Sequence, residues 1–167
     1  DITLRKEKEQ ELSRHGAIMS AVSRAAEQFL KTEDWEQNIS NVLENLGQVA
    51  DVSRVSVRIE PVDNATSVKN ATYEWKAQEN PYSEKPLSQV VFPVFVNGIQ
   101  WATISFDEFR NDRQWSNMEL EAFQTAANIL AAAETRTQTV HQLNRRQLAL
   151  GLLQDIATVS LQAANLN

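Results

Sequence analysis

The 167-residue chain is 42% hydrophobic and 23% charged, which is ordinary for a protein with one core and some appended structure. Its net charge of -6 argues against nucleic-acid binding, because such binding depends on attraction to the phosphate backbone. The absence of cysteine excludes disulfides, thiolate metal sites, catalytic thiols and thioether-linked chromophores. No apolar run reaches membrane-spanning length and no signal peptide is visible, so we expect a cytoplasmic protein without direct membrane contact.

The first expected helix is capped by Thr3 and runs to about residue 31. Its first half is rich in charged residues, so we expect that half to project from the domain. In the second half apolar residues recur at spacings of 4, 3 and 4, as along a coiled-coil seam: Ile18, Val22, Ala25 and Phe29. Such a stripe serves as core or as a dimer seam, and we favour core with dimer contacts at its edge.

A second helix follows, with Asp34 and Gln37 as its N-cap pair and Gly47 ending it or weakening its last turn. Its apolar residues share one face: Trp35, Ile39, Val42, Leu43 and Leu46. Two strands come next. Alternation predicts a half-buried strand over 52–60, and the strand over 71–77 carries two aromatic residues on one face.

Residues 87–108 form the clearest element, a β-hairpin. Asn97 and Gly98 favour a type I′ turn, which needs positive φ at both positions. This register places Val94 opposite Trp101 and gives two apolar faces: Val90, Phe92, Val94, Ile99 and Trp101 on one, and Val91, Phe95, Ala102, Ile104 and Phe106 on the other. Because both faces are apolar, we place the hairpin at the centre of a sheet, covered on both sides, with a bulge or unpaired side at Pro93.

The final helix has a well-marked beginning. Ser116 and Glu119 form a capping box, and Trp115 can pack on Leu120 as a hydrophobic staple. The stripe that covers the sheet is apolar: Leu120, Phe123, Ala126, Ala127, Leu130 and Ala131.

The helical pattern continues beyond the domain, because no proline follows. It passes through Val140 and Leu143 to Leu161, a length typical of a coiled-coil connector. There is also a weak internal echo at one fixed offset: Met19, Val22, Ala25 and Gln28 recur as Leu153, Ile156, Val159 and Gln162. The echo raises the hypothesis that the chain ends inside the entrance helix of a second copy of its own module.

These landmarks resemble a GAF domain, a ligand-sensing and dimerisation module of bacterial signalling proteins, over residues 18–135. The matching segments are 52–57, 73–75, 92–98 and 101–107, together with Arg113, Trp115-Ser116 and Glu119-Leu120. The resemblance implies an α+β fold, an α/β sandwich. Its central antiparallel sheet has helices packed on one face, and long coiled-coil-like helices stand at both ends.

The start of the chain is similar to the exit of a PAS domain into its signalling helix, as shown by Asp1-Ile2-Thr3-Leu4-Arg5-Lys6. We therefore expect a connector helix over 1–16, the GAF-like domain over 17–135 and an exit signalling helix over 136–167, which in the hypothesis above enters a second GAF domain. By resemblance, the parent protein ends in an output domain such as a histidine kinase of a two-component system or a diguanylate cyclase.

No enzyme motif is present, so we expect a regulatory domain rather than an enzyme. The carboxylates Asp107 and Glu108 are adjacent in a strand and point to opposite faces, which suits them poorly as an acid/base pair. We expect Asp107 to cap or brace the loop that follows. His15 and His141 lie on the connector helices, outside the expected core, and no metal site is expected.

Five residues are candidates for a ligand pocket: Arg58, Tyr73, Trp75, Phe92 and Trp101. For the four aromatic residues we favour a place in the core, and Arg58 would either meet an anion or pair with a surface carboxylate. The segment between Lys76 and Gln89 is shorter than the resemblance implies, which weakens any ligand assignment. No cofactor is expected, although an unknown small molecule stays open.

The sequence thus predicts a non-catalytic sensory domain that forms a homodimer through its terminal helices. Seven residues are assigned to the dimer and signalling helices: Ile18, Val22, Ala25, Phe29, Leu130, Val140 and Leu143. In this hypothesis the helices relay a conformational signal to the output domain of the same chain. The alternative is a ligand-free spacer that dimerises and holds the flanking domains apart.

Overall fold

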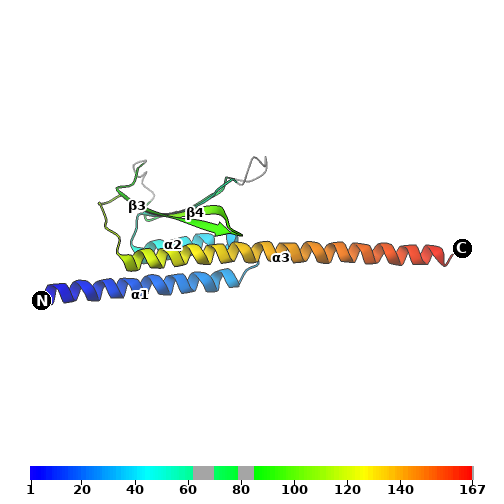
Figure 1. Ribbon diagram of the computed structural model, residues 1–167, viewed down its shortest axis with the longest axis horizontal. Helices are drawn as coiled ribbons and strands as arrows, with labels where there is room; N and C mark the ends of the chain where they lie inside the picture. Colours follow the sequence, from blue (N-terminus) through cyan, green and yellow to red (C-terminus); the bar gives the residue numbers. More distant parts are fainter. Residues whose placement is uncertain (62–69, 79–84, 167) are drawn as a thin grey trace.

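The computed structural model describes residues 1–61, 70–78 and 85–166. The order of its elements is α1 (Ile2–Leu30), a 3₁₀ turn η1 (Trp35–Gln37), α2 (Ile39–Ala50), β1 (Arg54–Ile59), β2 (Thr72–Lys76), β3 (Ser88–Val96), β4 (Ile99–Glu108) and α3 (Asn117–Ala164). The four strands form one antiparallel sheet in the order β2-β1-β4-β3. This is the predicted α+β fold with its helices on one face of the sheet (Figure 1).

The helices form two layers beneath the sheet. Helices α2 and α3 pack on the sheet, and α1 packs against both of them on the side away from the strands (Figure 1). Helices α1 and α3 run side by side in the same direction, whereas α2 runs the opposite way. The N-terminus and the C-terminus therefore lie at opposite ends of the molecule.

Aromatic packing fills the core between β4 and α3. Phe106 stacks on Phe123 with ring centroids 3.9 Å apart, and Phe92 meets both rings edge-on. Such pairs stabilise the fold by about 0.5–1.5 kcal/mol beyond the area that they bury. The inner residues of β1 are Val55, Val57 and Ile59, as the alternation predicted, and they are buried.

The helix ends follow local chemistry. Ser116 and Glu119 form the predicted capping box, and α3 then continues without interruption for 48 residues. At the start of α1, however, Asp1 is the cap instead of Thr3, because the Asp1 carboxylate accepts the Thr3 backbone N–H. Asp34 caps the short η1 turn and not α2, since its side chain accepts the backbone N–H of Glu36.

The predicted turn of the hairpin is confirmed, because Asn97 and Gly98 have φ of 53° and 78°. Phe95 and Val96 pair with Gln100 and Ile99 in the register that a two-residue turn sets, but the predicted pair of Val94 and Trp101 is wrong. A bulge between Val94 and Phe95 sets Val94 opposite Ala102, so that Trp101 has no partner on β3. The bulge moves one set of side chains to the other face: Ala102, Ile104 and Phe106 share the helix-facing side with Val90, Phe92 and Val94.

The predicted central position of the hairpin is also wrong, because β3 is an edge strand and β4 alone lies inside the sheet. Its second face is not covered by the residues that the structure describes. Val91, Phe95 and Ile99 are 49%, 54% and 56% exposed.

Gly47 does not end α2, which continues to Ala50 and stops at Asp51 in the left-handed conformation. The glycine has a packing role instead. The six-membered ring of Trp75 on β2 lies directly on the Gly47 backbone, in the space that a Cβ atom would occupy. Glycine is therefore required for the contact between α2 and β2.

We predict that Gly47→Ala lowers the melting temperature by several degrees, because the new methyl group displaces Trp75. Alanine in a helix normally stabilises it by roughly 1 kcal/mol relative to glycine, so the sign of the change is diagnostic. Gly151→Ala is the matched control, since nothing lies within 4 Å of that glycine. Thermal unfolding followed by circular dichroism measures both, and a Gly47→Ala protein as stable as the Gly151→Ala control contradicts this packing role.

Candidate functional site

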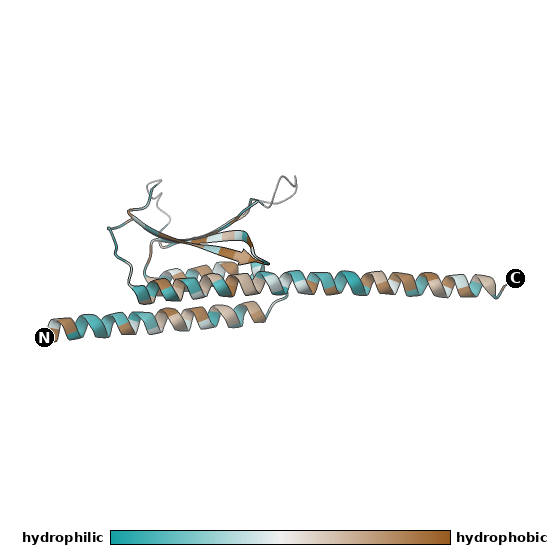
Figure 2. Ribbon diagram, viewed as in Figure 1, coloured by the Kyte–Doolittle hydropathy of each residue, from teal (hydrophilic) through white to brown (hydrophobic). Residues whose placement is uncertain are grey.

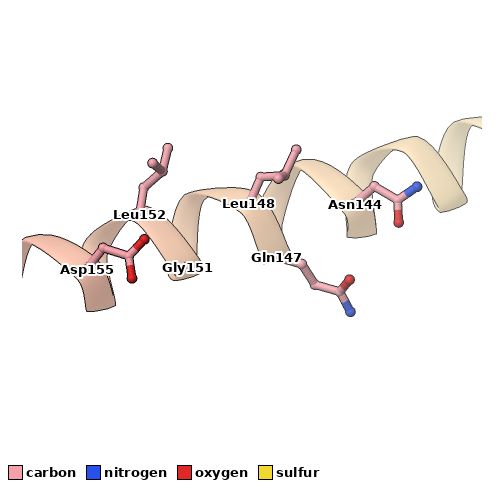
Figure 3. Close-up of a pocket in the computed structure, with 6 residues that line it drawn as sticks. All are labelled: Asn144, Gln147, Leu148, Gly151, Leu152 and Asp155. Carbon is pink, nitrogen blue, oxygen red and sulfur yellow. The ribbon is translucent and has the colours of Figure 1, made fainter.

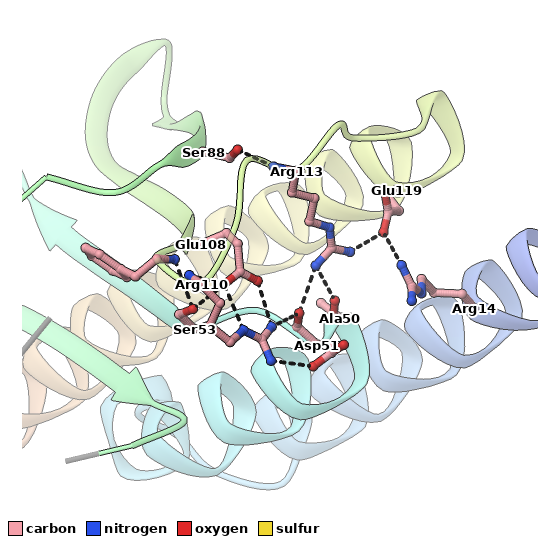
Figure 4. Close-up of polar contacts among 10 residues, drawn as sticks. Arg14, Ala50, Asp51, Ser53, Ser88, Glu108, Arg110, Arg113 and Glu119 are labelled. Carbon is pink, nitrogen blue, oxygen red and sulfur yellow. Dashed lines mark hydrogen bonds and ion pairs between the residues drawn. The ribbon is translucent and has the colours of Figure 1, made fainter. Parts of the chain in front are cut away.

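A network of charged side chains joins the sheet to all three helices. We call it the polar junction and define it by Arg14, Asp51, Ser53, Glu108, Arg110, Arg113 and Glu119 (Figure 4). These residues come from α1, from the C-cap of α2, from the residue before β1, from the end of β4, from the loop after it and from the first turn of α3. The junction is therefore the place where a movement of the sheet would be transmitted to the helices.

Glu108 is the buried centre of one half of the junction, with 1% of its surface exposed. Its carboxylate accepts hydrogen bonds from the Ser53 hydroxyl at 2.5 Å and from the Arg110 guanidinium at 2.7 and 2.8 Å. Burial raises the pKa of this carboxyl, but the hydrogen bonds outweigh it and lower the pKa to about 2. Glu108 is thus ionised throughout the physiological range. Arg110 also binds the Asp51 carboxylate and backbone carbonyl, which ties β4 to the end of α2.

Glu119 is the centre of the other half. One of its oxygens accepts a short hydrogen bond from Arg113 and pairs with Arg14 of α1 at 3.7 Å, while the other accepts the Ser116 backbone N–H. Arg113 in turn donates to the backbone carbonyls of Ala50 and Asp51 at 3.0 and 2.8 Å. One glutamate therefore caps α3 and connects it to α1 and, through Arg113, to α2.

The two adjacent carboxylates of β4 point to opposite faces, as predicted. The expectation that Asp107 braces the following loop is wrong, because Asp107 accepts from Arg54 and Gln89 on the outer face of the sheet. The loop is held by Glu108, which accepts the Arg110 backbone N–H at 2.9 Å.

Two of the five pocket candidates come together. Tyr73 and Trp101 each meet the Trp35 ring edge-on, with centroids 5.3 and 5.4 Å away. The Trp35 indole N–H donates to Glu134 of α3 at 2.5 Å. Burial raises the pKa of the Tyr73 phenol to about 12, assisted by a hydrogen bond to Glu36. This aromatic cluster joins β2 and β4 to η1 and α3.

The other three candidates lie apart from that cluster. Phe92 packs in the core with Phe106 and Phe123, Trp75 lies on Gly47, and Arg58 is exposed on the outer face of β1. The described residues thus place the five candidates in four different surroundings. A ligand role for any of them stays a prediction.

The dimer and signalling residues divide by exposure. Ile18, Val22, Ala25, Phe29 and Leu130 are at most 6% exposed, because they pack inside their own protomer. Val140 is half-buried and Leu143 is 52% exposed. The expected boundaries at 16/17 and 135/136 both fall inside continuous helices.

An apolar groove of about 150 Å³ lies on the surface between α1 and α3. Its lining is made mostly of small and aliphatic side chains: Ala26, Phe29, Leu30, Ile129, Ala132, Ala133 and Arg136. Arg136 also donates to the Phe29 and Thr32 carbonyls, so it caps the end of α1. The groove therefore lies between two helices that Arg136 joins at the end of α1.

Most residues of the polar junction could not be predicted from the sequence. Arg113 and Glu119 were singled out only through the family resemblance and the capping box. No periodicity marks Asp51, Arg110 or Arg14, since they come from separate elements and meet only in the fold. The histidines differ from each other: His15 is half-buried, with its Nδ1 atom 3.2 Å from the Met118 carbonyl oxygen, while His141 is exposed. Among the described residues no cluster of three or more potential metal ligands occurs.

Comparison with known proteins supports this fold. No family model matches the chain. It is 25% identical over 200 aligned positions to the methanogenesis regulatory histidine kinase FilI of Methanothrix harundinacea. The alignment covers 93% of this chain and 22% of that protein. The chain thus spans about a fifth of its relative's length. Since 93% of the chain is about 155 residues, about 45 aligned positions have no residue of this chain opposite them.

A solved structure shows the same architecture. The free methionine-R-sulfoxide reductase of Neisseria meningitidis, solved with its substrate, superimposes with a TM-score of 0.58 at 13% identity, over 75% of this chain and 93% of that chain. No helix in the described part of the chain is long and apolar enough to cross a membrane. The chain has a GAF-like fold and a distant sequence similarity to a regulatory histidine kinase.

We predict that Arg113→Ala lowers the free energy of unfolding by about 3 kcal/mol, because it leaves the buried Glu119 carboxylate without its principal partner. Arg113 is 11% exposed and Glu119 7% exposed in this ion pair. Arg5→Ala is the matched control: its pair with Glu9 is 83% and 66% exposed, and such surface pairs contribute little. Urea unfolding measures both variants, and equal stabilities contradict a buried role for Arg113.

Proposed function

We propose that this chain is a non-catalytic regulatory domain that passes a conformational signal from its N-terminal helix to a downstream output domain. The observation that carries the proposal is the parallel packing of α1 and α3, whose free ends lie at opposite ends of the domain (Figure 1). A helix that enters at one end and a helix that leaves at the other suit a domain inserted between an input and an output. The similarity to a regulatory histidine kinase supports an output of that type, with a diguanylate cyclase as the other candidate.

The polar junction supplies the coupling in this proposal. A shift of β4 would act on Arg110 and Arg113 and would reach α2 through Asp51 and α3 through Glu119. Small displacements of helices at a packed interface are a common form of switching. The domain would convert a movement of the sheet into a change in the crossing of α1 and α3.

A homodimer through the terminal helices fits this mechanism. On α1 the groove residues Ala26 and Leu30 belong to a row with spacings of 7, 7 and 4 that begins at Leu12 and Met19. Small residues such as Ala26 and Ala132 allow another helix to approach closely. We therefore assign the dimer contacts of the domain body to this groove, beside the buried seam.

The alternative function is a ligand-free spacer. It is favoured by the placement of four of the five pocket candidates in aromatic and glycine contacts with the protein itself. A spacer would need the dimer but not the coupling. An unidentified small molecule bound to the domain would favour the sensory function instead.

The relay is tested by changing the helical phase of α3. In a chimera that continues α3 into a histidine kinase core, inserting two residues after Asn144 rotates everything downstream by about 200°, whereas seven residues restore the phase to within about 20°. We expect autophosphorylation to change at least fivefold with two residues and to return with seven. The spacer function predicts the same autophosphorylation activity for all insertions, and that result would contradict the relay.

The dimer is tested by placing a charge in the groove. Ala132→Glu should weaken self-association at least tenfold, because a carboxylate would be buried in an apolar contact where Arg136 is already bonded to the Phe29 and Thr32 carbonyls. Ala132 is exposed in the protomer, so folding should be unaffected. Gln124→Glu adds the same charge at an exposed position outside the groove and should leave the dimer intact. Sedimentation equilibrium measures the self-association of both variants. A monomeric 167-residue chain without substitutions contradicts the dimer.

A further inference from the structure

Helix α3 carries two apolar rows on different faces. The first packs against its own domain, and its buried residues are spaced alternately by 4 and 3: Glu119, Phe123, Ala126, Leu130, Ala133 and Thr137. Continuing the same spacing past Val140 gives polar residues or glycine as far as Thr158, before the row reaches Leu161: Asn144, Gln147, Gly151, Gln154 and Thr158. The surface that faces the domain thus ends where the domain ends.

A second row begins on another side of the helix. Leu152, Ile156 and Val159 are spaced by 4 and 3 and are 64%, 62% and 65% exposed. At 100° per residue this row is rotated by about a fifth of a turn from the buried first row and by about a third of a turn from the polar continuation of that row. Leu148 and Leu152 point to the same side of the helix, and Gln147 points away from them (Figure 3). Alternating apolar and polar patches along this segment are visible in Figure 2.

The described part of the protomer offers nothing to cover the second row. The last turns of α3 extend well beyond the sheet, α1 and α2, and the free half of α1 projects from the opposite end (Figure 1). The leucines that flank the row, Leu148 and Leu153, are also 69% and 62% exposed. So wide an apolar surface indicates a partner.

The chemistry of the row favours a second copy of the same helix. Placing Leu152 at position d of a heptad puts Ile156 at position a, and this choice favours parallel two-stranded coiled coils. Burying a Leu, Ile or Val fully removes roughly 60–120 Å² of apolar surface from water, which makes this row one part of the ~800 Å² per partner that a stable dimer needs. The groove between α1 and α3 lies on the same helix and supplies a second part.

We propose that residues 149–163 of α3 pair in parallel with the same segment of a second copy, through Leu152, Ile156 and Val159. This deepens the proposed homodimer and rests on it. The pairing surface is distinct from the one that packs on the domain, so α3 changes face between Val140 and Ala149. A rotation of α3 against its own domain would therefore turn the paired segment in a fixed sense.

The alternative is that a following folded unit of the same polypeptide covers this row, in place of a second copy. At one fixed offset the row Leu152, Ile156 and Val159 matches Ile18, Val22 and Ala25, which are buried in α1. A following folded unit of the same polypeptide could cover the row as α2 and α3 cover α1. The two occupants give opposite results in the experiment below, which uses the 167-residue chain alone.

Single cysteines provide the test, because the chain has none of its own. Leu152→Cys and Val159→Cys should both form intermolecular disulfides on mild oxidation, since a disulfide requires Cα atoms within about 7 Å. Gln147→Cys and Gln154→Cys lie on the row that continues the domain-facing side and should cross-link at least fivefold more slowly. An antiparallel pair would cross-link at no more than one of the two seam positions. Non-reducing electrophoresis measures all four.

The outcomes separate this proposal from the dimer itself. If sedimentation shows a dimer but positions 152 and 159 link no faster than 147 and 154, the paired segment is refuted while the groove dimer stands, and the following-unit occupant is favoured. If the 167-residue chain without substitutions is a monomer, the paired segment and the groove dimer are both refuted. Leu152→Cys that cross-links as fast in the Ala132→Glu background indicates that the paired segment associates independently of the groove.

Discussion

The structure depends on the parallel contact between α1 and α3, which is fixed at both ends by polar bonds and between them by apolar packing. At one end Arg14 meets Glu119 and His15 meets the Met118 carbonyl. At the other, Arg136 binds the last carbonyls of α1 and the Thr137 hydroxyl donates to Glu33. Between them the first helix buries its whole apolar stripe. Two helices held in this way move as a pair unless a force acts on one end.

Beside the apolar core contact of Phe106 with Phe123, the junction and the aromatic cluster are two places where the sheet can exert such a force. They act on opposite ends of the packed part of α3, through Glu119 in the first turn and through Glu134 four turns later. The sheet therefore holds α3 at two separated points. A twist of the strands changes the load at the two points unequally, which would tilt α3 and not merely translate it.

The elements of this fold could be predicted from the sequence because their signals are local. The capping box at Ser116, the Asn97-Gly98 turn and the alternation of β1 each depend on residues close in the chain. The bulge after Val94 could not be predicted, because it follows from pairing with β4 and shifts the register by one residue. Gly47 was misjudged for a similar reason: the residue that explains it, Trp75, is 28 positions away. The polar junction is the extreme case, since its charges come from six segments of the chain.

The edge position of β3 has a consequence for how the molecule behaves in a crowded solution. An exposed edge strand offers unpaired backbone groups to any other strand, and its apolar outer face would strengthen such contacts. Pro93 in the middle of β3 has no N–H to offer, and the bulge beside it bends the ladder. Together they discourage the sheet from growing by addition of further strands, which guards against fibrous aggregation at this edge.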